Sequence, residues 1–276
     1  MPLRPLALDA LCEADLDRKL AKVAALEAQE STLAIAPDPI LPTPANLPGR
    51  PALPVLIDPA KVPQRSVQTL EGRAALIHAI CHIEFNAINL ALDAIWRFAG
   101  MPEDCYRDWL RVAIEEARHF RLLHDHLQSL AHDTQTGVPR WRYGSFPAHD
   151  GLWAMCEKTR DDITARMALV PRTLEARGLD ATPLIQNKLR ATGAPDALAA
   201  CGILDIILRD EIGHIAIGNH WYGWLCARQA LEPVAHYRAL VRHYKAPRLK
   251  GPFNTSARRQ AGFSDAELAA LATPAR

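Results

Sequence analysis

The sequence contains the motif Glu-x-x-His twice, and each copy lies in the middle of a long helical pattern. Glu116 and His119 form the first pair, and Glu211 and His214 form the second. Residues three positions apart lie on one face of a helix, so each pair can present a carboxylate and an imidazole to the same point. The rest of that face is apolar in both segments, which predicts that the pairs are buried. Because a buried carboxylate without a partner costs several kcal/mol, these helices require a neutralising group.

Two further carboxylates interrupt apolar helical stripes. Glu84 lies 32 residues before Glu116, and Glu175 lies 36 residues before Glu211, so an antiparallel hairpin brings each lone glutamate level with one pair. Four carboxylates at separations of ~4 Å repel by about 4 kcal/mol per pair at an effective dielectric constant of about 20. Two divalent cations balance those charges, as in the dinuclear sites of four-helix bundles. The predicted metal ligands are Glu84, Glu116, His119, Glu175, Glu211 and His214, with Asp162 and Glu157 as alternatives to Glu175.

The residue before each motif glutamate is also acidic. Glu115 and Asp210 are turned by about 100° from the ligand face, and a metal-bound histidine normally donates its second N–H to a carboxylate. We predict that Glu115 holds His214 and that Asp210 holds His119. The alternative is that both acids lie on an ordinary helix surface.

Proline divides the chain into three parts. Residues 1–66 are predicted to form one amphipathic helix at 15–29 and then a strap, because nine of the 21 prolines lie between residues 36 and 64 and exclude regular helix there. We expect this strap to dock on the protein and to bury Val55, Leu56 and Ile57, with a disordered leader as the alternative. Residues 67–228 are predicted to form the four-helix bundle, and residues 229–276 a basic helical extension.

The bundle is predicted to be all-α. Its helical patterns run over residues 67–99, 102–131, 150–178 and 195–228, with a short extra helix at 183–192. Pro171 predicts a kink in the third of these helices, because it lacks an N–H and clashes with the preceding turn. Further helices are expected at 233–244 and after Ser264, where Ser264-x-x-Glu267 is a capping box.

Composition excludes several classes of protein. The chain has 32 Lys plus Arg against 31 Asp plus Glu, so its net charge does not call for nucleic acid as a partner. The basic segment 228–259 is predicted to be a solvated face, with contact to RNA or an anionic substrate as the alternative. Six scattered cysteines indicate reduced core residues rather than disulfides or a zinc site. Because the sequence has no signal-peptide pattern or long apolar run, we expect a cytoplasmic protein without membrane contact. The sequence does not indicate the oligomeric state, for which a homodimer is one candidate.

The ligand pattern resembles that of the ferritin-like superfamily, whose members share the order Glu, Glu-x-x-His, Glu, Glu-x-x-His. The chain looks most similar to a bacterial ferritin-like family that is catalogued as a domain of unknown function and sometimes mislabelled a rhamnosyltransferase. The matching stretches are Ala94-Ile-Trp-Arg-Phe98, Glu115-Glu-Ala-Arg-His119, His149-Asp-Gly-Leu-Trp153, Glu175-Ala-Arg-Gly-Leu-Asp180, Asp210-Glu-Ile-Gly-His214, Gly218-Asn-His-Trp221 and Pro252-Phe-Asn254. The resemblance covers most of residues 67–260 and implies iron at the six predicted ligands. It implies no reaction of its own, although related ferritin-like enzymes hydroxylate tRNA with O2.

From the ligand set and this resemblance we expect a di-iron oxygenase or oxidase that uses O2. Its substrate would be a small organic molecule or a modified nucleoside, the electron donor is not indicated, and a manganese–iron pair is the alternative to two iron ions. Iron storage or peroxide scavenging is a second class of function, against which the long wraps argue because they would cover the surfaces that storage proteins use to assemble. A metal-stabilised structural protein is a third class, against which the complete ligand set argues.

Overall fold

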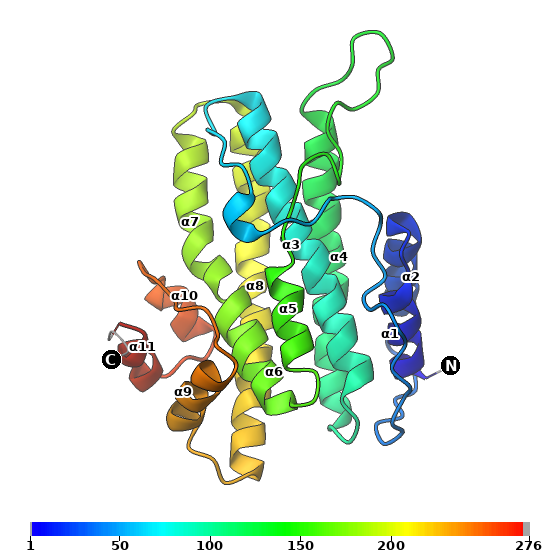
Figure 1. Ribbon diagram of the computed structural model, residues 1–276, viewed down its shortest axis with the longest axis vertical. Helices are drawn as coiled ribbons and strands as arrows, with labels where there is room; N and C mark the ends of the chain where they lie inside the picture. The colour runs from blue at the N-terminus through cyan, green and yellow to red at the C-terminus, as the bar shows by residue number, and fades with distance from the viewer. Residues whose placement is uncertain (1, 273–276) are drawn as a thin grey trace. The chain divides into compact units, whose positions relative to one another are not determined.

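The computed structural model describes residues 2–272, in which the regular secondary structure is helical and no strand is present (Figure 1). The chain divides into two compact units, residues 1–151 and 152–276. The first unit contains α1 (Leu3–Cys12), α2 (Leu16–Ala28), the short 3-10 helix η1 (Pro59–Lys61), α3 (Leu70–Arg97) and α4 (Glu103–Ser129). From the boundary onward follow α5 (Gly151–Lys158), α6 (Ile163–Leu169), the π-helix η2 (Val170–Glu175), α7 (Arg177–Arg190), α8 (Pro195–Arg228), α9 (Pro233–His243), α10 (Thr255–Gln260) and α11 (Asp265–Ala272). The predicted all-α fold is confirmed.

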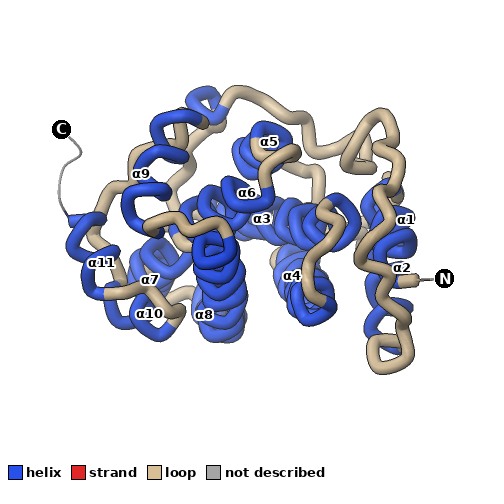
Figure 2. The backbone as a smooth tube through the Cα atoms, turned by 90° about the horizontal axis from the view of Figure 1, so that it is seen from below, coloured by secondary structure: helices blue, strands red, loops and turns tan. Residues whose placement is uncertain are grey.

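An antiparallel hairpin of α3 and α4 forms the centre of the first unit. The hydroxyl of Thr69 caps the start of α3 by accepting the N–H of Gly72 at 3.0 Å. Phe85 and Phe120 pair across the hairpin with ring centroids 6.1 Å apart, which sets the register of the two helices. Seen end-on in Figure 2, α1 and α2 lie together beside the hairpin, where α1 packs on α3 and α2 packs on α4.

The length and composition of α3 are those of a membrane-spanning helix. Its most apolar window of 18 residues is nevertheless 78% buried inside the protein. A core helix of a soluble protein has the same properties, so this helix is weak evidence for a membrane.

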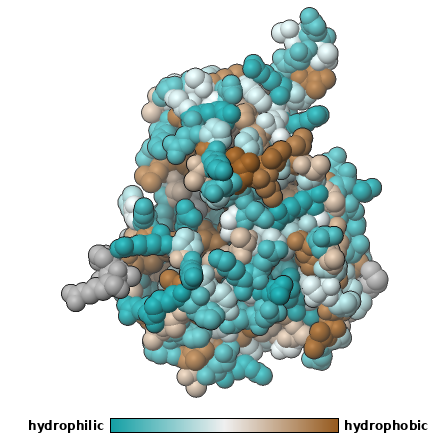
Figure 3. Space-filling model, in the orientation of Figure 1, coloured by the Kyte–Doolittle hydropathy of each residue, from teal (hydrophilic) through white to brown (hydrophobic). Residues whose placement is uncertain are grey.

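The proline-rich segment docks on the first unit, as predicted, but for a different reason. Main-chain hydrogen bonds attach it: Gly49 N–H donates to Leu11 O at 2.9 Å, and Ile57 N–H donates to Ala148 O at 2.9 Å. The expectation that docking buries the apolar side chains is wrong for two of the three, since Val55 is 57% exposed and Leu56 is 37% exposed. A brown patch interrupts the hydrophilic surface where this segment crosses in front of α3 (Figure 3).

Arg4 joins the strap to the core from α1, a helix that the sequence did not predict. Its guanidinium is 1% exposed and donates five hydrogen bonds to main-chain carbonyls. The acceptors are Ile95 and Trp96 at the end of α3, and Ala36, Pro37 and Pro39 in the strap. The carbonyls at the C-terminal end of a helix lack partners within the helix and carry partial negative charge, so a cation is favourable there.

We expect His78 to make the protein sensitive to acid. This residue is fully buried in α3, where its Nε2 accepts the N–H of Gly144 at 3.0 Å. Burial, with a smaller effect from His124, lowers the pKa of His78 to about 4. The unfolded chain therefore takes up the proton first, and stability is lost as the pH falls from 6.5 towards 4, by about 3 kcal/mol for this group.

The variant His78→Gln tests this expectation, because its amide oxygen can still accept the Gly144 N–H but does not titrate. Urea unfolding of both proteins at pH 7 and pH 4 measures the effect. The free energy of unfolding should fall less steeply with acid in the variant than in the wild type. Equal losses in the two proteins would show that His78 does not couple folding to protonation.

The third predicted bundle helix differs most from expectation. It is not continuous from 150 to 178: α5 ends at Lys158 and α6 begins at Ile163, where the Asp162 side chain caps the new helix by accepting the N–H of Ala165 at 2.9 Å. The helical segment also continues past residue 178, because α7 runs on to Arg190. The separate helix expected at 183–192 is therefore the second half of α7. Pro183 is tolerated inside α7 because the carbonyl of Leu179, which a proline cannot bond, accepts from the side-chain amide of Asn254 at 3.2 Å.

The irregularity predicted at Pro171 is present as the π-helix η2. There the hydroxyl of Thr173 donates to the carbonyl of Ala168 at 2.8 Å. Gly218 on α8 lets the proline ring approach closely, since a Cβ atom at that position would lie 2.6 Å from two carbons of Pro171. The absence of a side chain at Gly218 therefore fixes where η2 meets α8.

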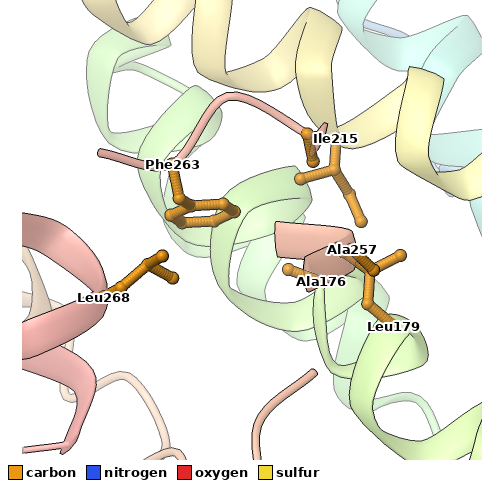
Figure 4. Close-up of a cluster of buried hydrophobic side chains, with 7 residues drawn as sticks. Ala176, Leu179, Ile215, Ala257, Phe263 and Leu268 are labelled. Atoms are coloured by element: carbon orange, nitrogen blue, oxygen red, sulfur yellow. The ribbon is translucent and has the colours of Figure 1, made fainter. Parts of the chain in front are cut away.

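The segment from α6 to α7 runs antiparallel to α8. Gln229, directly after α8, donates to Thr164 Oγ1 at 2.8 Å, and Gln186 on α7 donates to Cys201 O at 3.1 Å. Between these contacts, Ala176 shares an apolar cluster with Ile215 (Figure 4). Glu175 therefore lies level with the middle of α8, where His214 is found.

Three short helices, α9, α10 and α11, complete the second unit (Figure 2), where α9 packs on α6 and α8, and α10 packs on α8. The predicted capping box is present: Glu267 N–H donates to Ser264 Oγ at 3.3 Å, and Ser264 N–H donates to Glu267 Oε2 at 2.8 Å. The sequence did not predict α10, which has only six residues. It is fixed by tertiary contacts, among them the bond from buried Arg258 to Asp180 at 2.6 Å.

Candidate metal centre

The α3–α4 hairpin brings three of the predicted ligands together inside the first unit. Nδ1 of His119 lies 3.3 Å from Oε2 of Glu84 and 3.5 Å from Oε2 of Glu116. The three residues are 0%, 3% and 1% exposed, respectively. All three offer ligand atoms within 4.8 Å of one another, so this buried cluster could hold a metal ion.

The protonation of this cluster reflects its burial. Burial raises the pKa of Glu84 well above its ordinary value, and the charge of Glu116 raises it further. Burial alone would lower the pKa of His119, but its contacts with Glu116 and Glu84 outweigh this effect and raise that pKa to about 11. Protons thus neutralise the cluster when no cation is bound. Because metal ligands must be deprotonated, a cation that replaces these protons binds more tightly as the pH rises.

The donors of the cluster fit a transition metal. Oε2 of Glu84 is buried and makes no hydrogen bond of good geometry, although His119 lies close to it. Buried carboxylate oxygens in native cores nearly always have a partner, and an ion or water is the usual explanation when the protein supplies none. Carboxylate and imidazole together are the donor set of di-iron and di-manganese sites in helical bundles.

The second Glu-x-x-His pair forms a similar arrangement in the second unit. We call each such group of carboxylate and imidazole donors within one unit a half-site. Nδ1 of His214 lies 3.7 Å from Oε1 of Glu211, and the side chains are 2% and 13% exposed. In both pairs the same imidazole nitrogen, Nδ1, faces the carboxylate. The antiparallel register places Glu175, at the end of η2, level with His214. Its role as the third ligand of this half-site stays a prediction.

The two alternatives to Glu175 have other surroundings. Asp162 uses Oδ1 to cap α6, and its carboxylate also contacts the hydroxyl of Tyr244. Glu157 is exposed on α5. Neither carboxylate is oriented as a buried ligand, which favours Glu175 among the three.

The two outer acids are not equivalent. Asp210 is 13% exposed and accepts both the Nε and the Nη2 hydrogen bonds of its neighbour Arg209, at 2.8 and 3.2 Å. Glu115 is half-buried on α4. The predicted contacts from Glu115 to His214 and from Asp210 to His119 stay predictions.

Sequence reasoning missed Arg172, which lies at the centre of η2 and is only 4% exposed. A charged side chain directly after the proline of an otherwise apolar segment was the available signal. Its partners come from α8, α9 and α11, and no local pattern indicates them.

Comparison with known proteins finds a family of unknown function, and membership of the ferritin-like superfamily stays a prediction. Residues 12–269 match the model of a family described as "Protein of unknown function (DUF455)". An uncharacterized protein of Haemophilus influenzae is 49% identical over 230 residues, which cover 81% of this chain and 76% of that protein. No solved structure matches. The chain therefore belongs to the DUF455 family of proteins of unknown function.

Proposed function

We propose that this protein is a ferritin-like, non-haem di-iron oxygenase or oxidase that uses O2 to oxidise a small organic molecule or a modified nucleoside. In this proposal each unit supplies half of one ligand set. Glu84, Glu116 and His119 come from the first unit, and Glu175, Glu211 and His214 come from the second. The proposal joins the two halves because the sequence repeats the same combination, one glutamate with one Glu-x-x-His pair, in both units.

The observation that carries the proposal is the buried cluster in the first unit. One imidazole nitrogen there faces two carboxylates that are at most 3% exposed. Burying two carboxylates and an imidazole together costs desolvation free energy even when protons neutralise them, and a purely structural role gives no reason for that cost.

In the first unit, three residues would bind the metal and two aromatic residues would exclude water from it. Glu84 and Glu116 supply the negative charge, and His119 supplies a neutral nitrogen after Nδ1 loses its proton. Phe85 and Phe120, which follow two of these ligands and are at most 1% exposed, keep water from the cluster. Bound iron would supply the redox chemistry with O2.

Metal analysis and O2 consumption test the proposal. Protein purified without chelator and reconstituted anaerobically with ferrous iron should hold about two metal ions per chain, mainly iron. On mixing with O2 in a stopped-flow instrument, the iron-loaded protein should consume O2 and change its absorption spectrum, and iron should stay at about two per chain.

Other results would support another class of function. Uptake of many iron atoms per chain would indicate storage. Two bound metals with no reaction towards O2 would leave a structural or hydrolytic role. Only traces of iron or manganese after reconstitution would contradict the metal centre itself.

A further inference from the structure

The π-helix η2 is held from several sides by one side chain, that of Arg172. Its Nε donates to Oδ1 of Asn219 on α8, and its Nη2 donates to Oε1 of Glu267 on α11. The guanidinium is 4% exposed although it is charged. A buried arginine that bonds two different helices restricts the position of its own backbone.

Three aromatic rings surround the same guanidinium. Its central carbon lies 4.3 Å from the ring centroid of Tyr222 on α8, 5.4 Å from that of Tyr237 on α9 and 5.3 Å from that of Phe263. A cation within about 6 Å of an aromatic centroid is attracted to the ring face, and more strongly when water is excluded. Arg172 therefore connects η2 to helices that reach to the C-terminal end of the described chain.

The neighbours of Arg172 are fixed as well. Pro171 packs against the bare backbone of Gly218, and the hydroxyl of Thr173 bonds that of Tyr237 at 2.9 Å. Three consecutive residues of η2 thus have separate anchors. Irregular helical turns persist only where their surroundings determine them, and π-helical turns are frequent at functional sites.

We propose that Arg172 is a positioning residue for the metal half-site of the second unit. It holds the π-helical turn so that Glu175, three residues later, stays level with His214. The C-terminal segment takes part through Glu267, which makes α11 a support of the half-site. This inference rests on the proposed function, because it assigns Glu175 to the metal.

Titration with Co²⁺ under anaerobic conditions, followed by its visible absorption, tests the proposal in the full-length chain. The wild type should bind about two equivalents. Arg172→Gln should bind the first equivalent normally and the second up to about 10–100-fold more weakly, the range known for the loss of residues that support metal ligands. Glu267→Gln, which keeps the shape of the side chain, should weaken the same equivalent to a smaller extent.

Two matched controls separate positioning from general stability. Arg166→Gln removes another buried arginine of this unit, one that bonds Thr159 Oγ1 and Cys156 O. Ser264→Ala removes the hydroxyl that caps α11 and its bond to Oε2 of Glu267 at 2.8 Å, but it keeps Oε1 of Glu267, which is the atom that accepts from Arg172. Thermal melts of the metal-free proteins should show losses for the controls too, but both controls should keep two equivalents of Co²⁺.

The possible failures are distinguishable. If Arg172→Gln and Glu267→Gln bind both equivalents as tightly as the wild type, the positioning role is wrong and the proposed function stands. If the wild type binds no Co²⁺, the proposed function is wrong and this inference falls with it.

Discussion

Glu116→Ala is expected to empty most of the metal centre. This carboxylate is 1% exposed and lies 3.5 Å from the imidazole nitrogen of its own motif, so its loss removes one of the three donors of the buried cluster. Loss of an outer partner alone costs about 10–100-fold in metal affinity, and loss of a ligand costs more. Elemental analysis after anaerobic iron loading and desalting should fall from about two ions per chain to well below one. Glu211→Ala should have the same effect if the second half-site belongs to the same centre.

Asp162→Ala is the matched control for these two variants. It also removes a carboxylate, but one that caps α6, so it should cost about 1 kcal/mol of stability and leave the metal content unchanged. If Asp162→Ala empties the site and Glu175→Ala does not, the assignment of Glu175 as the ligand is wrong. Unchanged metal content in Glu116→Ala would contradict the centre in the first unit.

Arg4→Ala is expected to destabilise the first unit by about 3–5 kcal/mol, since removal of a buried charged group leaves its partners unsatisfied. Five main-chain carbonyls lose their donor in this variant, two at the end of α3 and three in the strap. The melting temperature should fall by about 10 °C, at roughly 2–4 °C per kcal/mol for a chain of this size. Limited proteolysis should then cut first within residues 36–64, because the strap has lost its attachment to α3.

Arg18→Ala provides the comparison on the neighbouring helix. Its side chain is 71% exposed and pairs with Glu13, so its loss should change stability by no more than about 0.5 kcal/mol. If Arg4→Ala were equally mild, the hydrogen bonds of Arg4 would not hold the strap. Protection of residues 36–64 from protease in the Arg4 variant would lead to the same conclusion.

The long helices were predictable because their apolar faces repeat with the period of the helix. The last bundle helix was predicted at 195–228 and is observed as Pro195–Arg228. The ends of the hairpin helices α3 and α4 differ from prediction by one to three residues. The same periodicity puts the two residues of each Glu-x-x-His motif on one face. The spacing of 32 residues between Glu84 and Glu116 predicted that Glu84 lies level with the first motif, and it is observed beside His119.

The irregular parts depended on contacts between residues far apart in the sequence. Nothing near residue 183 indicates that a helix continues through proline; Asn254, more than 70 residues later, supplies the donor that makes it tolerable. The short helix α10 has too few residues for a periodic pattern and exists because Arg258 bonds Asp180. A local pattern cannot predict such elements, because the free energy that stabilises them comes from elsewhere in the chain.

The sequence by itself determined the chemistry of this protein: which carboxylates and imidazoles are buried, and on which helical faces they lie. Those properties follow from residue type and from the fixed geometry of the helix. Only the tertiary structure decided how the strap is attached and how the turn before Glu175 is built. Val55 and Leu56 are exposed although the strap is docked, because main-chain hydrogen bonds and Arg4 hold it. Likewise, Pro171 forms a π-helical turn because Gly218 leaves room for its ring and Arg172 anchors the turn to α8 and α11.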